Sequence, residues 1–125
     1  MARFIYGDRI GKQADLRPSV IALIFDHNNE TILLTRRTDN GLWCLPGGAM
    51  DSGESVDEAC AREVLEETGL TVRVTRLVGI YSTPHRIIEY ADGNQYQALN
   101  MAFEVEVLGG SLRVNEEVNE FGYFS

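Results

Sequence analysis

One segment of this 125-residue chain, Ser55 to Thr68, carries each local signal of an α-helix, whereas most of the remainder has the character of strands and turns. Ser55 is a favourable N-cap residue, and Glu58 three positions later completes a capping box. Gly69 follows at the position where a glycine commonly ends a helix. The apolar segments rich in β-branched residues are 19–25, 31–36, 72–82, 87–90 and 96–107. One helix among these predicted strands indicates a single α+β domain.

Turn residues between the apolar segments predict how the strands pair. The turn cluster at 27–30 separates 19–25 from 31–36, so we expect these two segments to form a hairpin. The turn at 91–94 separates 87–90 from 96–107 in the same way. The remaining expected elements are short strands at 111–114 and 121–124, an N-terminal arm at 1–17 with an edge strand at 4–6, and a main domain at 18–125.

The predicted helix has two distinct faces when its residues are placed at steps of about 100°. The residues on its apolar side are Val56, Cys60, Ala61, Val64 and Leu65. Glu63, Glu66 and Glu67 lie on a neighbouring arc together with Ala59. Carboxylates three and four positions apart repel one another, and the C-terminal end of a helix dipole also disfavours anions. A divalent cation such as Mg²⁺ would remove this cost, although a solvated acidic face is the simpler alternative.

The charge of the chain excludes some partners. The formal net charge is −8, and seven acidic residues against one arginine place −6 of it between positions 51 and 70. Such a chain is a poor binder of nucleic acid polymers or anionic membranes, but a small nucleotide could arrive with metal. Ten arginines against a single lysine suit phosphate contacts, although drift in composition explains the bias equally well. No signal peptide or apolar run of about 18 residues is evident, so we expect a cytoplasmic location.

A diglycine, Gly47-Gly48, precedes the acidic helix and lets a ligand approach the backbone closely. From Gly48 onward the sequence reads GAMDSGESVDEACAREVLEETGL. This segment resembles the Nudix box, G-x5-E-x7-R-E-U-x-E-E-x-G-U with U a bulky aliphatic residue, at every defined position. The lead-in from Trp43 through Pro46 is also similar to the family's usual entry to the box.

The resemblance implies an α/β/α sandwich with a mixed central sheet, in which 55–68 is the catalytic helix. Family members usually continue from a late aromatic strand, here Tyr123-Phe124, into a C-terminal helix. That helix is missing from this sequence, so it is absent, supplied otherwise or trimmed. An uncovered apolar sheet face would favour a homodimer.

The resemblance further implies a pyrophosphohydrolase that uses two or more Mg²⁺ or Mn²⁺ ions. The implied metal ligands are the Gly47 carbonyl, Glu63, Glu66 and Glu67. Arg62 would hold the glutamates in position, with Glu54 and Gly48 in supporting roles around the ligands. The base that accepts the proton of the attacking water would be Glu63 or an acid of the late loop. Glu117 and Glu120 fit that loop position best, with Glu116 beside them.

The sequence gives weaker indications of which residues bind the substrate. Arg36 and Arg37 could contact phosphate, and His85 and Arg86 could line a pocket. Pro84 lies fourteen residues beyond Leu70, close to a proline typical of ADP-ribose diphosphatases but displaced from it. We therefore favour ADP-ribose or another nucleotide sugar as substrate. The alternatives are a nucleoside triphosphate pyrophosphohydrolase that removes oxidised nucleotides, or a Nudix module that senses a nucleotide without cleaving it.

Overall fold

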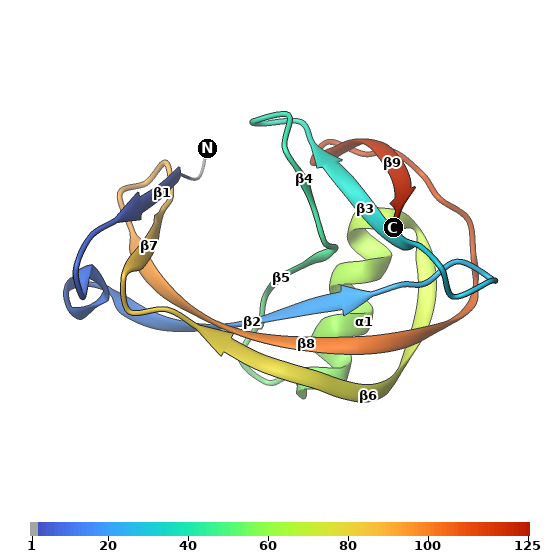
Figure 1. Ribbon diagram of the computed structural model, residues 1–125, viewed down its shortest axis with the longest axis horizontal. Coiled ribbons are helices and arrows are strands. Elements are labelled where there is room, and N and C mark those ends of the chain that lie inside the picture. The colour runs from blue at the N-terminus through green and yellow to red at the C-terminus, as the bar shows by residue number, and fades with distance from the viewer. Residues whose placement is uncertain (1–2) are drawn as a thin grey trace.

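The computed structural model of the protein describes residues 3–125 (Figure 1). The first elements are β1 (Arg3–Tyr6), the 3-10 helix η1 (Ile10–Gln13), β2 (Asp15–Leu23), β3 (Ile32–Arg37), β4 (Trp43–Cys44) and β5 (Gly47–Ala49). They are followed by α1 (Val56–Thr68), β6 (Leu70–Ser82), β7 (Arg86–Glu89), β8 (Gln95–Gly110) and β9 (Val118–Phe124).

The strands form two sheets. The larger sheet has six strands in the order β1-β7-β8-β2-β5, with β6 also paired to β8. Strands β2 and β8 run parallel, whereas the other pairs in this sheet are antiparallel, so the predicted mixed sheet is confirmed. The smaller sheet has the order β4-β3-β9. In Figure 1 the larger sheet curves upward at the end formed by β1 and β7, and the smaller sheet stands above its other end.

The expected hairpin between 19–25 and 31–36 is wrong, because β2 and β3 belong to different sheets. Strand β2 is bonded to β8 on one edge and to β5 on the other, which leaves no free edge for β3. The two segments are hydrogen-bonded to each other beside the turn, through the bridge between Phe25 and Ile32 and the bond from Leu33 N–H to Ile24 O. The turn residues correctly predicted a chain reversal, but they carry no information on which sheet receives the next strand.

The other pairings follow the sequence more closely. Strands β7 and β8 pair as expected, and β1 is the expected edge strand, paired with β7. The late strand is confirmed as β9. The strand expected at 111–114 is wrong. The backbone of this segment bonds to the end of α1 instead, where Arg113 N–H donates to Thr68 O over 3.0 Å.

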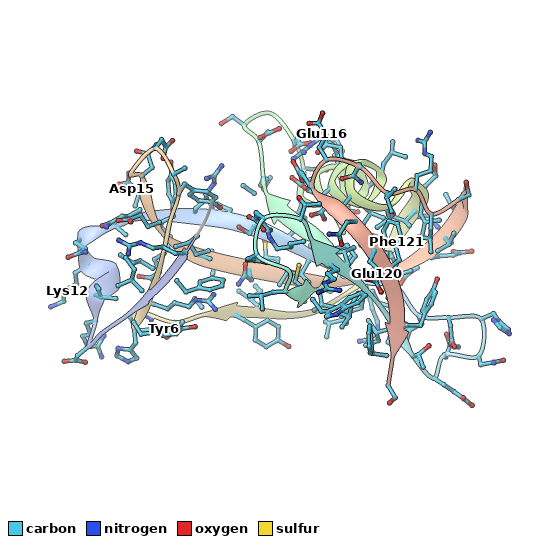
Figure 2. The ribbon with its side chains drawn as sticks, turned by 90° about the horizontal axis from the view of Figure 1, so that it is seen from above. Tyr6, Lys12, Asp15, Glu116, Glu120 and Phe121 are labelled. Carbon is cyan, nitrogen blue, oxygen red and sulfur yellow. The ribbon has the colours of Figure 1, made fainter. Side chains whose placement is uncertain are left out.

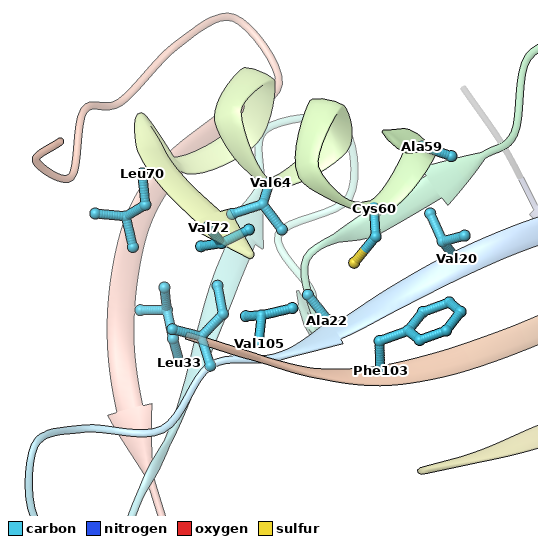
Figure 3. Close-up of a cluster of buried hydrophobic side chains, with 11 residues drawn as sticks. Val20, Ala22, Leu33, Ala59, Cys60, Val64, Leu70, Val72, Phe103 and Val105 are labelled. Carbon is cyan, nitrogen blue, oxygen red and sulfur yellow. The ribbon is translucent and has the colours of Figure 1, made fainter. Parts of the chain in front are cut away.

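Helix α1 has the predicted boundaries and caps. The Ser55 hydroxyl accepts from Glu58 N–H, the Glu58 carboxylate accepts from Ser55 N–H, and Gly69 ends the helix with a φ of 85°. The helix packs on the larger sheet through Ala59, Cys60 and Val64, which contact buried residues of β2, β6 and β8 (Figure 3). The expectation that Leu65 belongs to this face is wrong, because its side chain is 49% exposed and the fully buried Ala59 lies in the core instead.

Replacing Ser55 by Ala should lower the free energy of unfolding by about 1 kcal/mol, because the Glu58 N–H loses its acceptor. Urea unfolding in metal-free buffer measures this loss. Ser52→Ala, which changes an exposed serine in the preceding turn, is the matched control and should leave the urea midpoint unchanged. An equal loss in both variants would contradict the capping assignment.

Within residues 3–125, α1 is the single α-helix, so these residues do not form the second helical layer of the expected sandwich. Several large apolar side chains near the end of the chain are exposed: Val107, Leu108, Tyr123 and Phe124. A homodimer that covers them stays a prediction, as does the boundary between arm and domain at residue 17. Nowhere in the described chain is a helix both long and apolar enough to cross a membrane.

Candidate active site

Glu67 is the buried carboxylate of α1. It lies two helical turns beyond Cys60, so it shares the core-facing side of the helix and is only 7% exposed. Its Oε2 atom accepts the Gly47 N–H at 2.7 Å, which joins the helix to the diglycine strand. Burial raises the pKa of Glu67 to about 8, although the Gly47 hydrogen bond opposes the shift. Gly47, a predicted ligand through its carbonyl, therefore also contacts this site through its amide.

Glu63 lies one turn earlier, against Gly48. A Cβ atom at Gly48 would come within 2.7 Å of the Glu63 carboxyl carbon, so a residue with a side chain at position 48 would displace this carboxylate. Burial raises the pKa of Glu63, and the Arg62 guanidinium opposes the shift. Gly48 therefore supports the site by leaving room for the Glu63 carboxylate, which agrees with its expected supporting role.

Arg62 ties the helix to the loop that precedes it. Its Nε and Nη2 atoms donate to the two Glu54 oxygens at 2.5 and 3.0 Å, and Nη2 also donates to Ala49 O at 3.1 Å. Its Nη1 atom donates to Glu63 at 3.0 Å and to Glu66 at 3.3 Å. The guanidinium holds the pKa of Glu54 below its usual range. One cation thus fixes the positions of two of the three helix glutamates relative to the loop.

The late loop contributes Glu117 to the same cluster. The negative charge of Glu117 raises the pKa of both Glu63 and Glu67. The structure describes no ion pair for Glu117 among residues 3–125. Of the two late acids favoured from the sequence, Glu117 is therefore the one that acts on the helix carboxylates.

Glu120 and Glu116 have other surroundings. Glu120 faces Arg36 across β3 and β9, and its Oε1 lies 3.3 Å from the arginine Nη1. Glu116 is exposed, and its backbone carbonyl accepts from the Thr38 hydroxyl at 2.7 Å. Figure 2 shows Glu116 beside the end of the helix and Glu120 on β9. A catalytic role for Glu120 stays a prediction.

Asn115 connects this loop to α1, and the sequence did not predict this role. Its Nδ2 atom donates to the carbonyls of Glu66 and Glu67 at 3.3 and 2.9 Å. Its Oδ1 atom accepts the N–H groups of Glu117 and Val118 at 2.9 and 3.0 Å. The available signal was weak, because an Asn ahead of polar residues indicates a local turn and says nothing of a distant helix.

The predicted phosphate-binding arginines are engaged by neighbouring acids. Arg37 donates to both oxygens of Asp39, at 2.9 and 2.8 Å, and this pairing raises the pKa of Arg37, although burial opposes the shift. Arg36 pairs with Glu120 and donates to Gly41 O at 3.1 Å. Arg37 is close enough to Glu67 to lower the pKa of that carboxyl, so it is the arginine of the pair that lies near the cluster.

His85 and Arg86 lie with the N-terminal arm. The His85 Nδ1 atom accepts Arg9 N–H at 3.0 Å, and the Arg86 guanidinium stacks on the Phe4 ring at 4.8 Å. Tyr6, which is paired with Arg86, is at the opposite end of the molecule from Glu116 and Glu120 in Figure 2. The structure does not bring these two residues to the carboxylate cluster, and their role in substrate binding stays a prediction.

A hollow of about 240 Å³ lies between the upturned end of the larger sheet and the smaller sheet. It is lined by Phe4, Ile88 and Tyr90 from one side and by Arg37, Asn40, Leu42, Trp43 and Cys44 from the other. Three aromatic rings with two polar side chains suit a flat, partly polar group. Arg37 belongs both to this hollow and to the surroundings of Glu67.

The carboxylates suit a hard divalent cation by the chemistry of their atoms. In the described chain, no three His, Cys, Asp or Glu side chains already lie close enough together to enclose a metal ion. Arg62 instead holds Glu63 and Glu66. The site nevertheless offers only oxygen donors, and Glu67 has no direct cationic partner in residues 3–125. A donor set of carboxylate and carbonyl oxygens is the kind that Mg²⁺ and Mn²⁺ occupy.

The acidic helix packs on a mixed sheet, and Arg62 links it to the diglycine strand β5. This is the arrangement that the Nudix resemblance implied. The family model described as NUDIX domain matches residues 15–125. The chain is 32% identical to an ADP-ribose pyrophosphatase of Methanocaldococcus jannaschii, covering 95% of this chain and 73% of that protein. The chain therefore belongs to the Nudix hydrolase family, a class of pyrophosphatases.

Other similarities are shorter or cover less of the partner. A putative 8-oxo-dGTP diphosphatase of Bacillus subtilis is 47% identical, but only over 46% of this chain and 39% of its own length. The solved structure of a UDP-X diphosphatase superposes with a TM-score of 0.73 at 29% identity. That match covers 90% of this chain, which spans about half (52%) of the solved chain.

Proposed function

We propose that this chain is a metal-dependent pyrophosphohydrolase that cleaves a nucleoside diphosphate linked to another moiety. The observation that carries the proposal is the buried Glu67 carboxylate, bonded to Gly47 N–H and surrounded by the charges of Glu63 and Glu117. A buried carboxyl group without a cationic partner is costly to ionise, so its presence at the end of a helix favours a function over a structural role.

The proposed ligands of Mg²⁺, or of Mn²⁺, are Glu63, Glu66 and Glu67 with the Gly47 carbonyl, in a site that takes two or more ions. The bound ions would neutralise phosphate oxygens and lower the pKa of the attacking water. The protein's own contribution is positional. Arg62 holds Glu63 and Glu66 against the loop through its bonds to Glu54 and Ala49, and Gly48 leaves room for Glu63.

We assign proton transfer to Glu117 in preference to Glu63 or Glu120. Glu63 accepts a bond from Arg62, and Glu120 is paired with Arg36, so each is already engaged by a guanidinium. As water attacks phosphorus and the bond to the leaving phosphate oxygen breaks, the Glu117 carboxylate would accept the water proton. Support for this role comes from Asn115, which joins the Glu117 backbone to the end of the acidic helix, and from the negative charge of Glu117, which adds to the raised pKa of Glu63 and Glu67.

For the substrate we favour ADP-ribose or another nucleotide sugar. Support comes from the similarity over 95% of the chain to a protein named ADP-ribose pyrophosphatase. The hollow between the sheets, with Phe4, Trp43 and Tyr90, suits a nucleobase. Hydrolysis of an oxidised nucleoside triphosphate is the second candidate, favoured by the shorter similarity to a putative 8-oxo-dGTP diphosphatase. A sensing module is disfavoured because all the box glutamates are present.

A substrate panel tests the proposed function. We expect Mg²⁺-dependent cleavage of ADP-ribose and other nucleotide sugars, with weaker cleavage of 8-oxo-dGTP and dinucleoside polyphosphates, when products are separated by ion-exchange chromatography. The same reactions with EDTA are the control and should show no product. Faster turnover of 8-oxo-dGTP would favour the second candidate, and no turnover of any substrate with Mg²⁺ or Mn²⁺ would favour the sensing module.

A further inference from the structure

We infer that Asn115 is a positioning residue that holds Glu117 beside the end of the acidic helix by clamping the late loop to the end of α1. This inference rests on the proposed function, because it names what positions the proposed proton acceptor. The side chain of Asn115 bonds in two directions at once. Its amide nitrogen donates to the carbonyls of Glu66 and Glu67, while its oxygen accepts the N–H groups of Glu117 and Val118.

The helix side of this clamp uses groups that need partners. The last carbonyl groups of a helix find no N–H donor within the helix, so they accept hydrogen bonds from water, a side chain or another segment. Here Asn115 binds the carbonyls of Glu66 and Glu67, the two glutamates nearest the end of α1. Arg113 N–H binds the carbonyl of Thr68 in the next position, at 3.0 Å. Two residues of the late loop therefore dock on the end of the acidic helix.

The loop side of the clamp determines where Glu117 lies. Asn115 Oδ1 bonds the backbone of Glu117 itself, and the Asn115 N–H donates to Val118 O at 2.9 Å, which closes the turn. The Glu117 carbonyl also accepts Thr38 N–H at 3.0 Å, which fixes the far side of the turn to the segment after β3. The turn that carries Glu117 therefore needs a second attachment, on the side that faces the acidic helix, to fix its position there. Asn115 supplies that attachment.

Two variants separate the halves of the clamp. Asn115→Ala removes both, whereas Asn115→Asp keeps an oxygen for the Glu117 and Val118 amides but loses the donor to the helix carbonyls. We expect both variants to lower kcat roughly 10- to 100-fold with a much smaller change in KM, because the proton acceptor is displaced while the substrate site is kept. Asn119→Ala is the matched control and should keep wild-type kcat. Asn119 is an exposed residue on β9, and its side chain has no described hydrogen bond.

A double-mutant cycle distinguishes positioning from general loss of structure. If Asn115 acts through Glu117, then Asn115→Ala should cost little further kcat in a Glu117→Gln background. Full additivity of the two losses, or wild-type kcat in Asn115→Ala or Asn115→Asp, would overturn the inference. Wild-type kcat in Asn115→Asp alone would show that only the local turn matters and would also overturn the clamp to the helix.

Amide hydrogen exchange gives a readout that does not depend on activity. The Glu117 and Val118 amides should exchange at least several-fold faster in Asn115→Ala than in the wild-type chain, with Asn119→Ala unchanged. Unchanged exchange in Asn115→Ala would overturn the clamp. If the wild-type chain cleaves no substrate, the proposed function fails, while this measurement still decides whether Asn115 holds the loop.

Discussion

Replacing Glu67 by Gln is expected to abolish turnover while leaving the fold intact. Glutamine keeps an oxygen that can accept the Gly47 N–H, but it removes the buried negative charge that the proposed metal site requires. Substitution of groups that merely orient metal ligands lowers metal affinity or activity about 10- to 100-fold, so loss of a ligand should lower turnover by more than about 100-fold. Steady-state kinetics at saturating Mg²⁺ measures this loss, and urea unfolding in metal-free buffer should show equal or slightly greater stability.

Glu30→Gln is the matched control for this experiment. Glu30 is an exposed glutamate in the turn before β3, outside the carboxylate cluster, so the variant makes the same chemical change without touching the site. Its turnover and stability should equal those of the wild-type chain. Near-full turnover of Glu67→Gln at saturating Mg²⁺ would show that the metal assignment is wrong.

The stability of the metal-free protein should fall as pH rises from about 5 to 8. Burial raises the pKa of Glu67 from 4.5 to about 8 and also raises that of Glu63. The folded state therefore holds protons that the unfolded state releases in this interval, and rising pH favours unfolding. Each such proton contributes up to about 1.4 kcal/mol per pH unit. Urea unfolding in EDTA at pH 5, 6.5 and 8 measures the trend.

Glu67→Gln should flatten this pH dependence, because glutamine does not titrate. The gap in unfolding free energy between Glu67→Gln and the wild-type chain should therefore widen in favour of the variant as pH rises. Glu30→Gln should follow the wild-type trend. Equal slopes for wild type and Glu67→Gln would show that Glu67 is already charged at neutral pH without metal.

The helix and the Nudix box were predictable from the sequence because their determinants are local. The capping box, the terminal glycine and the i, i+3, i+4 spacing of Glu63, Glu66 and Glu67 all lie within one short segment. The contacts of Arg62 with Glu63 and Glu66 were predictable for the same reason, because they join residues within a single helical turn.

The strand pairing was only partly predictable. The link between β7 and β8 spans a short turn, and it was correct. The hairpin of β2 and β3 was wrong because β8, which is far away in the sequence, occupies one edge of β2, and β5 occupies the other. The strand expected at 111–114 was wrong because the backbone of this segment is hydrogen-bonded to the end of α1. In each case a long-range partner took the hydrogen bonds that local pattern assigned elsewhere.

The sequence by itself therefore determined the helix, its acidic arc, the concentration of charge at 51–70 and the family. Only the tertiary structure decided that Glu67 is buried and Glu66 exposed, that Glu117 joins the cluster while Glu120 pairs with Arg36, and that Asn115 clamps the loop to the helix. The physical reason is that helical spacing gives the direction of a side chain about its own axis, whereas burial and pairing depend on which distant segment packs against that direction.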